Sequence, residues 1–394
     1  MSTPRKEILR VYIGPVSGGG AMGQLGQIEV VSEALKKAGI ANGRTQSVEY
    51  IPDLCMGASG GNMALYIALS GNWSNGGITR VIQMLDPRMI SRSWFPKGLD
   101  FLPSFVLGIV EGSLFKDGYT AEKLLESFNN SKNIQDVEIW SLAMNKTQKR
   151  ASMFCNKKLT DSYVSSTTYS PFTFKTTPLE YLNGDIRLIS NVIAASASIP
   201  LIFEPKKIIG DDDYIDGGVA AASPFEFLSP EIYKIMKGIV VPYEYEKVLD
   251  PYPMPPPSEN PNLASRRNKQ LLQMVYFSPY DINSSNDTKS TLGNGSVFSF
   301  ISDYSSIKDR YTGLNLLQQM LNVGEEIKVI DSRVSTTSLE DVLATHYFKN
   351  FYLEMCLIDN PWFDIVNFTT EELLKLIEQS KSNIQWLFYY NDNI

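Results

Sequence analysis

A short apolar run ends in a Gly-Ala-Ser-Gly-Gly turn at residues 57–61 and passes directly into a helical pattern that continues to Leu69. This order predicts a strand, a tight turn and a helix, with Ser59 at the apex of the turn. Gly57 and Gly61 fit the pattern G-x-S-x-G, in which small residues let two backbone segments approach and hold the serine in a strained, exposed position. The helix N-terminus behind the serine favours negative charge. The pattern indicates a nucleophilic serine; the alternative is a Gly/Ser loop with a purely structural role.

A similar strand–loop–helix unit precedes this one in the chain. Residues 9–14 form an apolar run, the loop 15–23 is rich in glycine, and apolar residues then recur at helical spacing until Gly39. Backbone N–H groups in such a loop can hold an anion. The loop Gly18–Gly23 matches the dinucleotide pattern G-x-G-x-x-G, but the next strand runs into the serine turn instead of ending in an acidic residue. A Walker loop would need a Lys-Ser/Thr pair that is missing here. An oxyanion hole for Ser59 is the favoured interpretation, and a plain structural turn is the remaining one.

A carboxylate occupies a comparable position later in the chain. Tyr214 and Ile215 are typical of a short strand, and Asp216 follows them ahead of two glycines. The glycines leave the Asp216 side chain accessible and allow another loop to come close. The structural alternative is an Asp-Gly turn, which is common. The three carboxylates at 211–213 are typical of a solvated turn.

Strand and helix patterns alternate along most of the chain, which predicts a mostly parallel sheet covered on both faces. Residues 242–263 contain seven prolines and are expected to form a surface loop. Further strands are expected at 137–144, 149–155, 270–277, 327–330 and 352–358, and further helices at 186–197, 311–321 and from Thr369 or Thr370 onward.

Composition restricts the classes of function that the chain can have. The net charge of −7 without a dense basic stripe argues against a nucleic-acid partner. Three widely spaced cysteines form neither a disulfide framework nor a metal-binding pattern. The N-terminal residues lack the apolar core of a signal peptide, and no apolar run reaches the roughly 20 residues of a membrane span. We therefore expect a soluble, intracellular protein, without assigning a compartment.

The chain has a single histidine, His346. Zinc hydrolase chemistry built on several histidines is thereby excluded. A Ser-His-Asp enzyme would rest on this residue alone. The order Ser59, Asp216, His346 is that of α/β-hydrolases. His346 sits within the helix-like stretch 338–347, which has no turn to present it, so the triad is the less favoured mechanism.

The combination of Ser59, the Gly18–Gly23 loop and Asp216 with its two glycines resembles the patatin-like phospholipase family. The small-residue segment 193–200 is similar to the helix that precedes the aspartate in patatins, and residues 363–387 resemble the closing segment of that family. The resemblance implies a three-layer α/β sandwich with a mostly parallel central sheet. It also implies one domain over residues 1–394, with a core at about 7–241 and 268–390 and the Pro-rich surface loop between them.

The same resemblance implies lipid acyl hydrolysis by a Ser59–Asp216 dyad through an acyl-enzyme, without metal or cofactor. Backbone N–H groups of the glycine loop and of the serine turn would form the oxyanion hole; the residues concerned are Gly18, Gly19, Gly20 and Gly60. Phospholipid or lysophospholipid would be the substrate, with peripheral contact to a membrane and none to nucleic acid.

Two departures and two other functions stand beside this expectation. Patatins usually carry Asp before the three glycines and Arg after them, where this chain has Ser17 and Met22. A catalytically silent lipid-binding protein would use the aromatic stretch Trp94 to Phe115. A nucleotide-binding module would use the Gly18–Gly23 loop alone.

Overall fold

The structure is a computed structural model, and several internal segments lie outside its described part. The described residues are 8–17, 20–39, 52–70, 134, 137–156, 167–168, 177–182, 185, 187–198, 200, 205–220, 224, 271–279, 327–345, 351–357 and 370–390. The Pro-rich segment 242–263, the predicted helix 311–321 and the aromatic stretch 94–115 fall outside these ranges, so the single-domain organisation stays a prediction.

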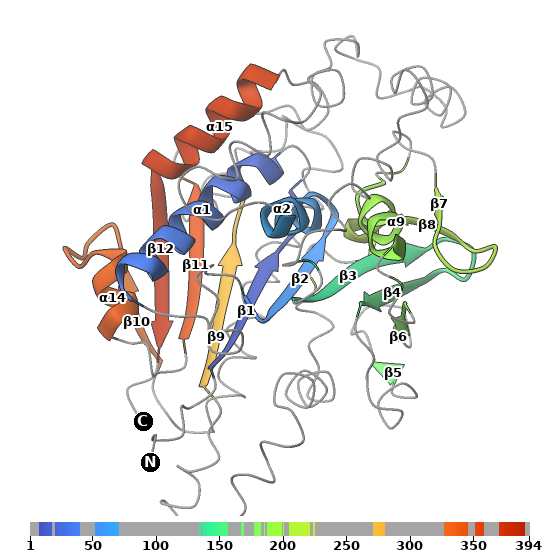
Figure 1. Ribbon diagram of the computed structural model, residues 1–394, viewed down its shortest axis with the longest axis horizontal. Helices are drawn as coiled ribbons and strands as arrows, with labels where there is room; N and C mark the ends of the chain where they lie inside the picture. The colour runs from blue at the N-terminus through green and yellow to red at the C-terminus, as the bar shows by residue number, and fades with distance from the viewer. Residues whose placement is uncertain are drawn as a thin grey trace, which may run out of the picture.

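Twelve strands of the described part form one mixed sheet (Figure 1). Its order is β10-β12-β11-β9-β1-β2-β3-β4-β6-β5, and β8 pairs with both β3 and β7. The five central strands are parallel to one another: β11 (Phe351–Leu357), β9 (Leu271–Phe277), β1 (Ile8–Gly14), β2 (Leu54–Ala58) and β3 (Glu138–Asn145).

Antiparallel strands flank this parallel centre. On one side β12 (Ile384–Tyr390) joins β11 to β10 (Lys328–Asp331). On the other side β4 (Arg150–Cys155) forms a hairpin with β3, as the polar turn after Asn145 predicts. The remaining strands are short: β5 (Thr167–Thr168), β6 (Thr177–Tyr181), β7 (Lys206–Lys207) and β8 (Asp213–Asp216).

A row of helices lies over the sheet (Figure 1). Helix α1 (Ala21–Lys37) packs between α15 (Thr370–Ser382) and α2 (Ser59–Ser70), and α2 in turn packs against α9 (Arg187–Ser196). Helix α14 (Leu339–Thr345) packs on α1 as well. Helix α1 ends as its sequence predicts, because two lysines occupy its last turn and Gly39 adopts a φ of +69° just beyond it.

Side chains on both faces of the central strands are buried. On the face of α1 and α2, Tyr12, Cys55 and Val275 belong to the main hydrophobic core. On the opposite face Met56 and Met274 are equally inaccessible. A parallel sheet with apolar strands covered on both faces is the α/β sandwich that the sequence predicts, and the prediction of fold class is confirmed.

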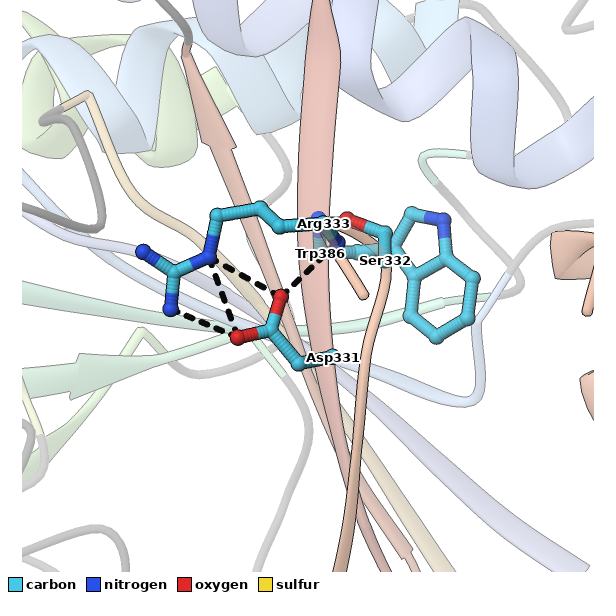
Figure 2. Close-up of polar contacts among 4 residues, drawn as sticks. All are labelled: Asp331, Ser332, Arg333 and Trp386. Atoms are coloured by element: carbon cyan, nitrogen blue, oxygen red, sulfur yellow. Dashed lines mark hydrogen bonds and ion pairs between the residues drawn. The ribbon is translucent and has the colours of Figure 1, made fainter. Parts of the chain in front are cut away.

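The turn after the edge strand β10 is held by its own polar groups (Figure 2). The carboxylate of Asp331 accepts from the backbone N–H and the guanidinium of Arg333, and the hydroxyl of Ser332 accepts from the backbone N–H of Trp386 at 2.9 Å. The Ser332 contact attaches the turn to β12. The turn leads toward α14, at the edge of the sheet and away from the central strands where the predicted site residues lie.

Candidate active site

Strand β3 brings the ends of two other strands together. The last residue of β2, Ala58, pairs with Leu142, and the next residue of β3, Ala143, pairs with the last residue of β8, Asp216. Because β8 runs antiparallel to β3 and β2 runs parallel to it, the two strand ends meet head-on along one edge of β3. Ser59, the residue after β2, and Asp216, the last residue of β8, are therefore brought close together.

Ser59 occupies the strained turn that its sequence predicts. Its φ is +51°, in the left-handed region that costs an L-residue roughly 1–2 kcal/mol. Small residues make this turn sterically feasible: a Cβ at Gly57 would lie 2.6 Å from Cα of Asn62, and one at Gly61 would lie 2.1 Å from the carbonyl oxygen of Pro15. The serine itself is almost fully buried, which differs from the exposed position that the motif suggests.

Asp216 accepts the hydroxyl of Ser59. The Ser59 Oγ to Asp216 Oδ2 distance is 2.7 Å, and Asp216 Oδ1 accepts from the backbone N–H of Gly218 at 2.6 Å. The second bond makes Asp216 the N-cap of a short 3₁₀ helix, Gly217–Val219. The two bonds fix the carboxylate, with one oxygen facing the serine.

Burial controls the charge of this carboxylate. The loss of hydration raises the pKa of Asp216 to about 7, although the bonds from Ser59 and Gly218 favour the ionised form and lower it. A carboxyl group with a pKa near neutrality can both take up and release a proton at physiological pH. The weak basicity of an ordinary aspartate is thus corrected by its surroundings.

The glycine loop lies against both motifs. Gly14 approaches Gly61 so closely that a Cβ on it would lie 2.5 Å from the Gly61 carbonyl oxygen, and Val16 contacts the position where a Cβ of Gly218 would be. Gly20 donates its N–H to the Ser17 carbonyl at 2.8 Å. Of the four predicted oxyanion donors, Gly60 lies in the first turn of α2, whereas Gly18 and Gly19 lie outside the described residues.

A buried glutamine anchors the described parts of the glycine loop. The side-chain amide of Gln24 donates to the carbonyls of Pro15 and Phe277, at 3.2 and 2.8 Å, and its oxygen accepts from the Ser17 hydroxyl at 2.7 Å. Ser17 stands where patatins have Asp, and Met22 where they have Arg. The polar support for the loop in this chain comes from Gln24, which the sequence pattern did not single out.

Residues just before Asp216 link β8 to the turn between β3 and β4. Asp212 accepts from the side chains of Asn145 and Gln148, and Asp213 accepts from the backbone N–H of Lys146 through its carbonyl. Asp211 is exposed, in agreement with the predicted solvated turn. These contacts attach β8 to the β3–β4 hairpin and support the placement of Asp216.

The sequence also singled out a histidine, three cysteines, and the presence or absence of a metal site and of a membrane span. His346 lies outside the described residues. Cys55 is buried in β2, and it, Cys155 and Cys356 are buried cysteines outside any disulfide. Within the described ranges, no group of three or more His, Cys, Asp or Glu side chains could hold a metal ion. Among the described helices, none combines the length and apolarity that crossing a membrane requires.

Comparison with known proteins gives one family match. The model of the family described as patatin-like phospholipase matches residues 16–229, more than half of the chain, and this range contains the glycine loop, Ser59 and Asp216. Among solved structures, VipD from Legionella pneumophila is similar over 98% of this chain and 68% of that chain, with 12% sequence identity and a TM-score of 0.29. None of the curated proteins matches the sequence.

Proposed function

The chain belongs to the patatin-like phospholipase family, and from this premise we propose that it hydrolyses acyl esters of phospholipids or lysophospholipids with a Ser59–Asp216 dyad. Membership of the family supports lipid hydrolysis in general. The choice of the two residues rests on one observation, the 2.7 Å hydrogen bond from Ser59 Oγ to Asp216 Oδ2. A nucleophile within hydrogen-bond reach of its base is the geometry that acyl transfer requires.

The proposed reaction proceeds through two tetrahedral intermediates. Ser59 Oγ attacks the ester carbonyl carbon, its proton passes to Asp216, and the carbonyl electrons move onto oxygen. Collapse of this intermediate expels the alcohol, which takes the proton from Asp216 and leaves the acyl group on Ser59. Water then attacks the acyl-enzyme with Asp216 again as base, and release of the fatty acid returns the proton to Ser59 Oγ.

The backbone N–H of Gly60 is the first candidate to hold the oxyanion. It lies in the opening turn of α2, whose N–H groups have no carbonyl partner within the helix. Gly18 and Gly19 are proposed as its partners in the glycine loop. Gly20 would join them only after releasing its bond to Ser17. Each donor is expected to contribute roughly 3 kcal/mol to stabilisation of the transition state.

The proposal includes a membrane surface as the place where the substrate is met. Long-chain phospholipids reside in bilayers or micelles, so the enzyme would make peripheral contact with a lipid surface. The negative net charge argues against a nucleic-acid partner. The proposed reaction moves one proton between a serine and an aspartate and requires no metal or cofactor.

The test is release of free fatty acid from phospholipid and lysophospholipid micelles by the wild type, Ser59→Ala and Asp216→Asn. We expect release by the wild type and its loss, by about a thousandfold or more, in both variants. Labelling of Ser59 by a fluorophosphonate reports the nucleophile independently of the substrate. Vesicle binding with neither release nor labelling would instead support the catalytically silent lipid-binding protein.

His346→Ala distinguishes the dyad from a triad. The dyad predicts that this variant retains esterase activity, because no step above uses an imidazole. A loss of about a thousandfold in a folded variant would overturn the dyad in favour of Ser59, Asp216 and His346 acting together.

A further inference from the structure

We propose that Ser196 is a positioning residue for the nucleophile, and that its hydroxyl holds the Ser59 backbone in the conformation that directs Oγ toward Asp216. The inference rests on the proposed function, since it gives Ser59 the role of nucleophile. Ser196 is the last residue of α9 and is fully buried.

The hydroxyl of Ser196 connects the end of β2 to the interior of β3. Its oxygen accepts from the backbone N–H of Ser59 at 3.0 Å, and its hydrogen is donated to the carbonyl of Leu142 at 2.6 Å. A hydroxyl has one hydrogen. Because the Leu142 carbonyl takes this hydrogen, the oxygen lone pairs are left to face the Ser59 amide, so the polarity of the link is fixed.

Ser59 needs such a link for two physical reasons. As the first residue of α2 it has an N–H without a carbonyl partner inside the helix, and burial makes an unpaired donor costly. Its φ of +51° is strained, so the backbone would relax unless its surroundings hold it. Rotation about this φ would move Oγ away from the Asp216 carboxylate.

The same end of α9 also holds the base. The backbone N–H of Asp216 donates to the carbonyl of Ser198 at 2.9 Å. The backbones of the nucleophile and of the base are thus bonded to residues two positions apart. Their separation is set by one helix end, and Ser196 supplies the only side chain among the described residues that bonds the Ser59 N–H.

The test compares Ser196→Ala with Ser380→Ala. Ser380 is a similarly buried serine in α15 whose hydroxyl donates to the Ile377 carbonyl within its own helix, so it controls for loss of a buried hydroxyl. We expect Ser196→Ala to lower kcat by about tenfold or more, with KM changed by less than about twofold, and Ser380→Ala to keep both values. Ser196→Cys carries a thiol, which is a weaker donor and acceptor than a hydroxyl, and its kcat is expected to lie between those of Ser196→Ala and Ser380→Ala. It replaces Ser196→Ala in the comparison if the alanine variant does not fold.

Hydrogen exchange at the Ser59 amide gives a readout that does not depend on turnover. Ser196→Ala is expected to accelerate this exchange by about tenfold or more relative to the wild type, whereas Ser380→Ala leaves it unchanged. Equal kcat in the two serine variants, or unchanged exchange in Ser196→Ala, would overturn the positioning role. Full activity in Ser59→Ala would instead refute the proposed function, and in that case exchange alone decides whether Ser196 holds this backbone.

Discussion

Ser59 donates its hydroxyl to Asp216 across 2.7 Å, although the two residues are 157 positions apart and both are almost completely shielded from water. Shielding raises the pKa of Asp216 to about 7. Asp216, the base that we propose, can accept a proton only when it is ionised, so the activity should depend on this one titration.

We expect kcat/KM on a short, uncharged ester to increase with pH through an apparent pKa near 7 and then to level off. Below this pH the carboxyl group is protonated and cannot accept the Ser59 proton. The measurement is a pH–rate profile of the wild type beside His346→Ala. A profile that is already flat at about pH 5 would contradict the raised pKa, and a profile that flattens only in His346→Ala would assign the titration to the histidine.

Asp216→Asn is expected to abolish activity and to stabilise the fold above neutral pH. A carboxyl group whose pKa is raised on folding, here from 3.8 to about 7, binds more protons in the folded state, so folding stability declines as pH rises between these values. The shift corresponds to at most about 4 kcal/mol. Asparagine removes the buried charge, so the free energy of unfolding of the variant should exceed that of the wild type at about pH 8 and approach it at about pH 4. Equal stability of both proteins at pH 8 would contradict the raised pKa of Asp216.

Ser59→Gly should be more stable than Ser59→Ala by about 1 kcal/mol. Both variants lose the hydroxyl, but only glycine adopts a φ of +51° without steric cost. Chemical denaturation of the two proteins measures the difference. A more stable alanine variant would show that the turn carries no strain, because alanine otherwise has the lower conformational entropy to lose.

Gln24→Leu should cost more stability than Gln27→Leu, its neighbour one turn later. Gln24 bonds Pro15, Ser17 and Phe277, whereas the amide of Gln27 donates to the single carbonyl of Ser278. We expect losses of about 3 and about 1 kcal/mol in the free energy of unfolding.

The same pair separates stability from catalysis. Because Gln24 supports the glycine loop, its variant is also expected to lower kcat, and the Gln27 variant to retain it. Equal rates in the two folded variants would show that the loop holds its shape without Gln24.

Much of the fold could be predicted from local patterns. The strand–turn–helix around Ser59, the β3–β4 hairpin, α9 and the parallel strands β1 and β9 each carry an apolar period and a glycine or polar turn at their ends. Strand β12 (Ile384–Tyr390) was not predicted, since its aromatic run follows α15 directly and lacks a turn signal. Its antiparallel pairing, like that of β8, depends on partners distant in sequence.

The site was predictable in its two principal residues and not in their supports. The glycines beside Ser59 and Asp216 mark them in the sequence, and the structure brings both together, although their catalytic roles remain a prediction. Gln24 and Ser196 lack any such marker. Ser196 lies seven positions after the buried Ile189 and so on the same, apolar face of α9. This placement indicates a buried polar side chain, but only the structure shows which groups it bonds.

Strands β2 and β8 meet end to end along β3, and their pairing with β3 fixes the spacing between Ser59 and Asp216. Ala58, the residue before Ser59, pairs with Leu142, and Asp216 pairs with the next residue of β3, Ala143. Insertions in the segments leading to β8 can lengthen the chain without altering that pairing. A slip of β8 by a single residue, by contrast, would turn Asp216 to the opposite face of the sheet.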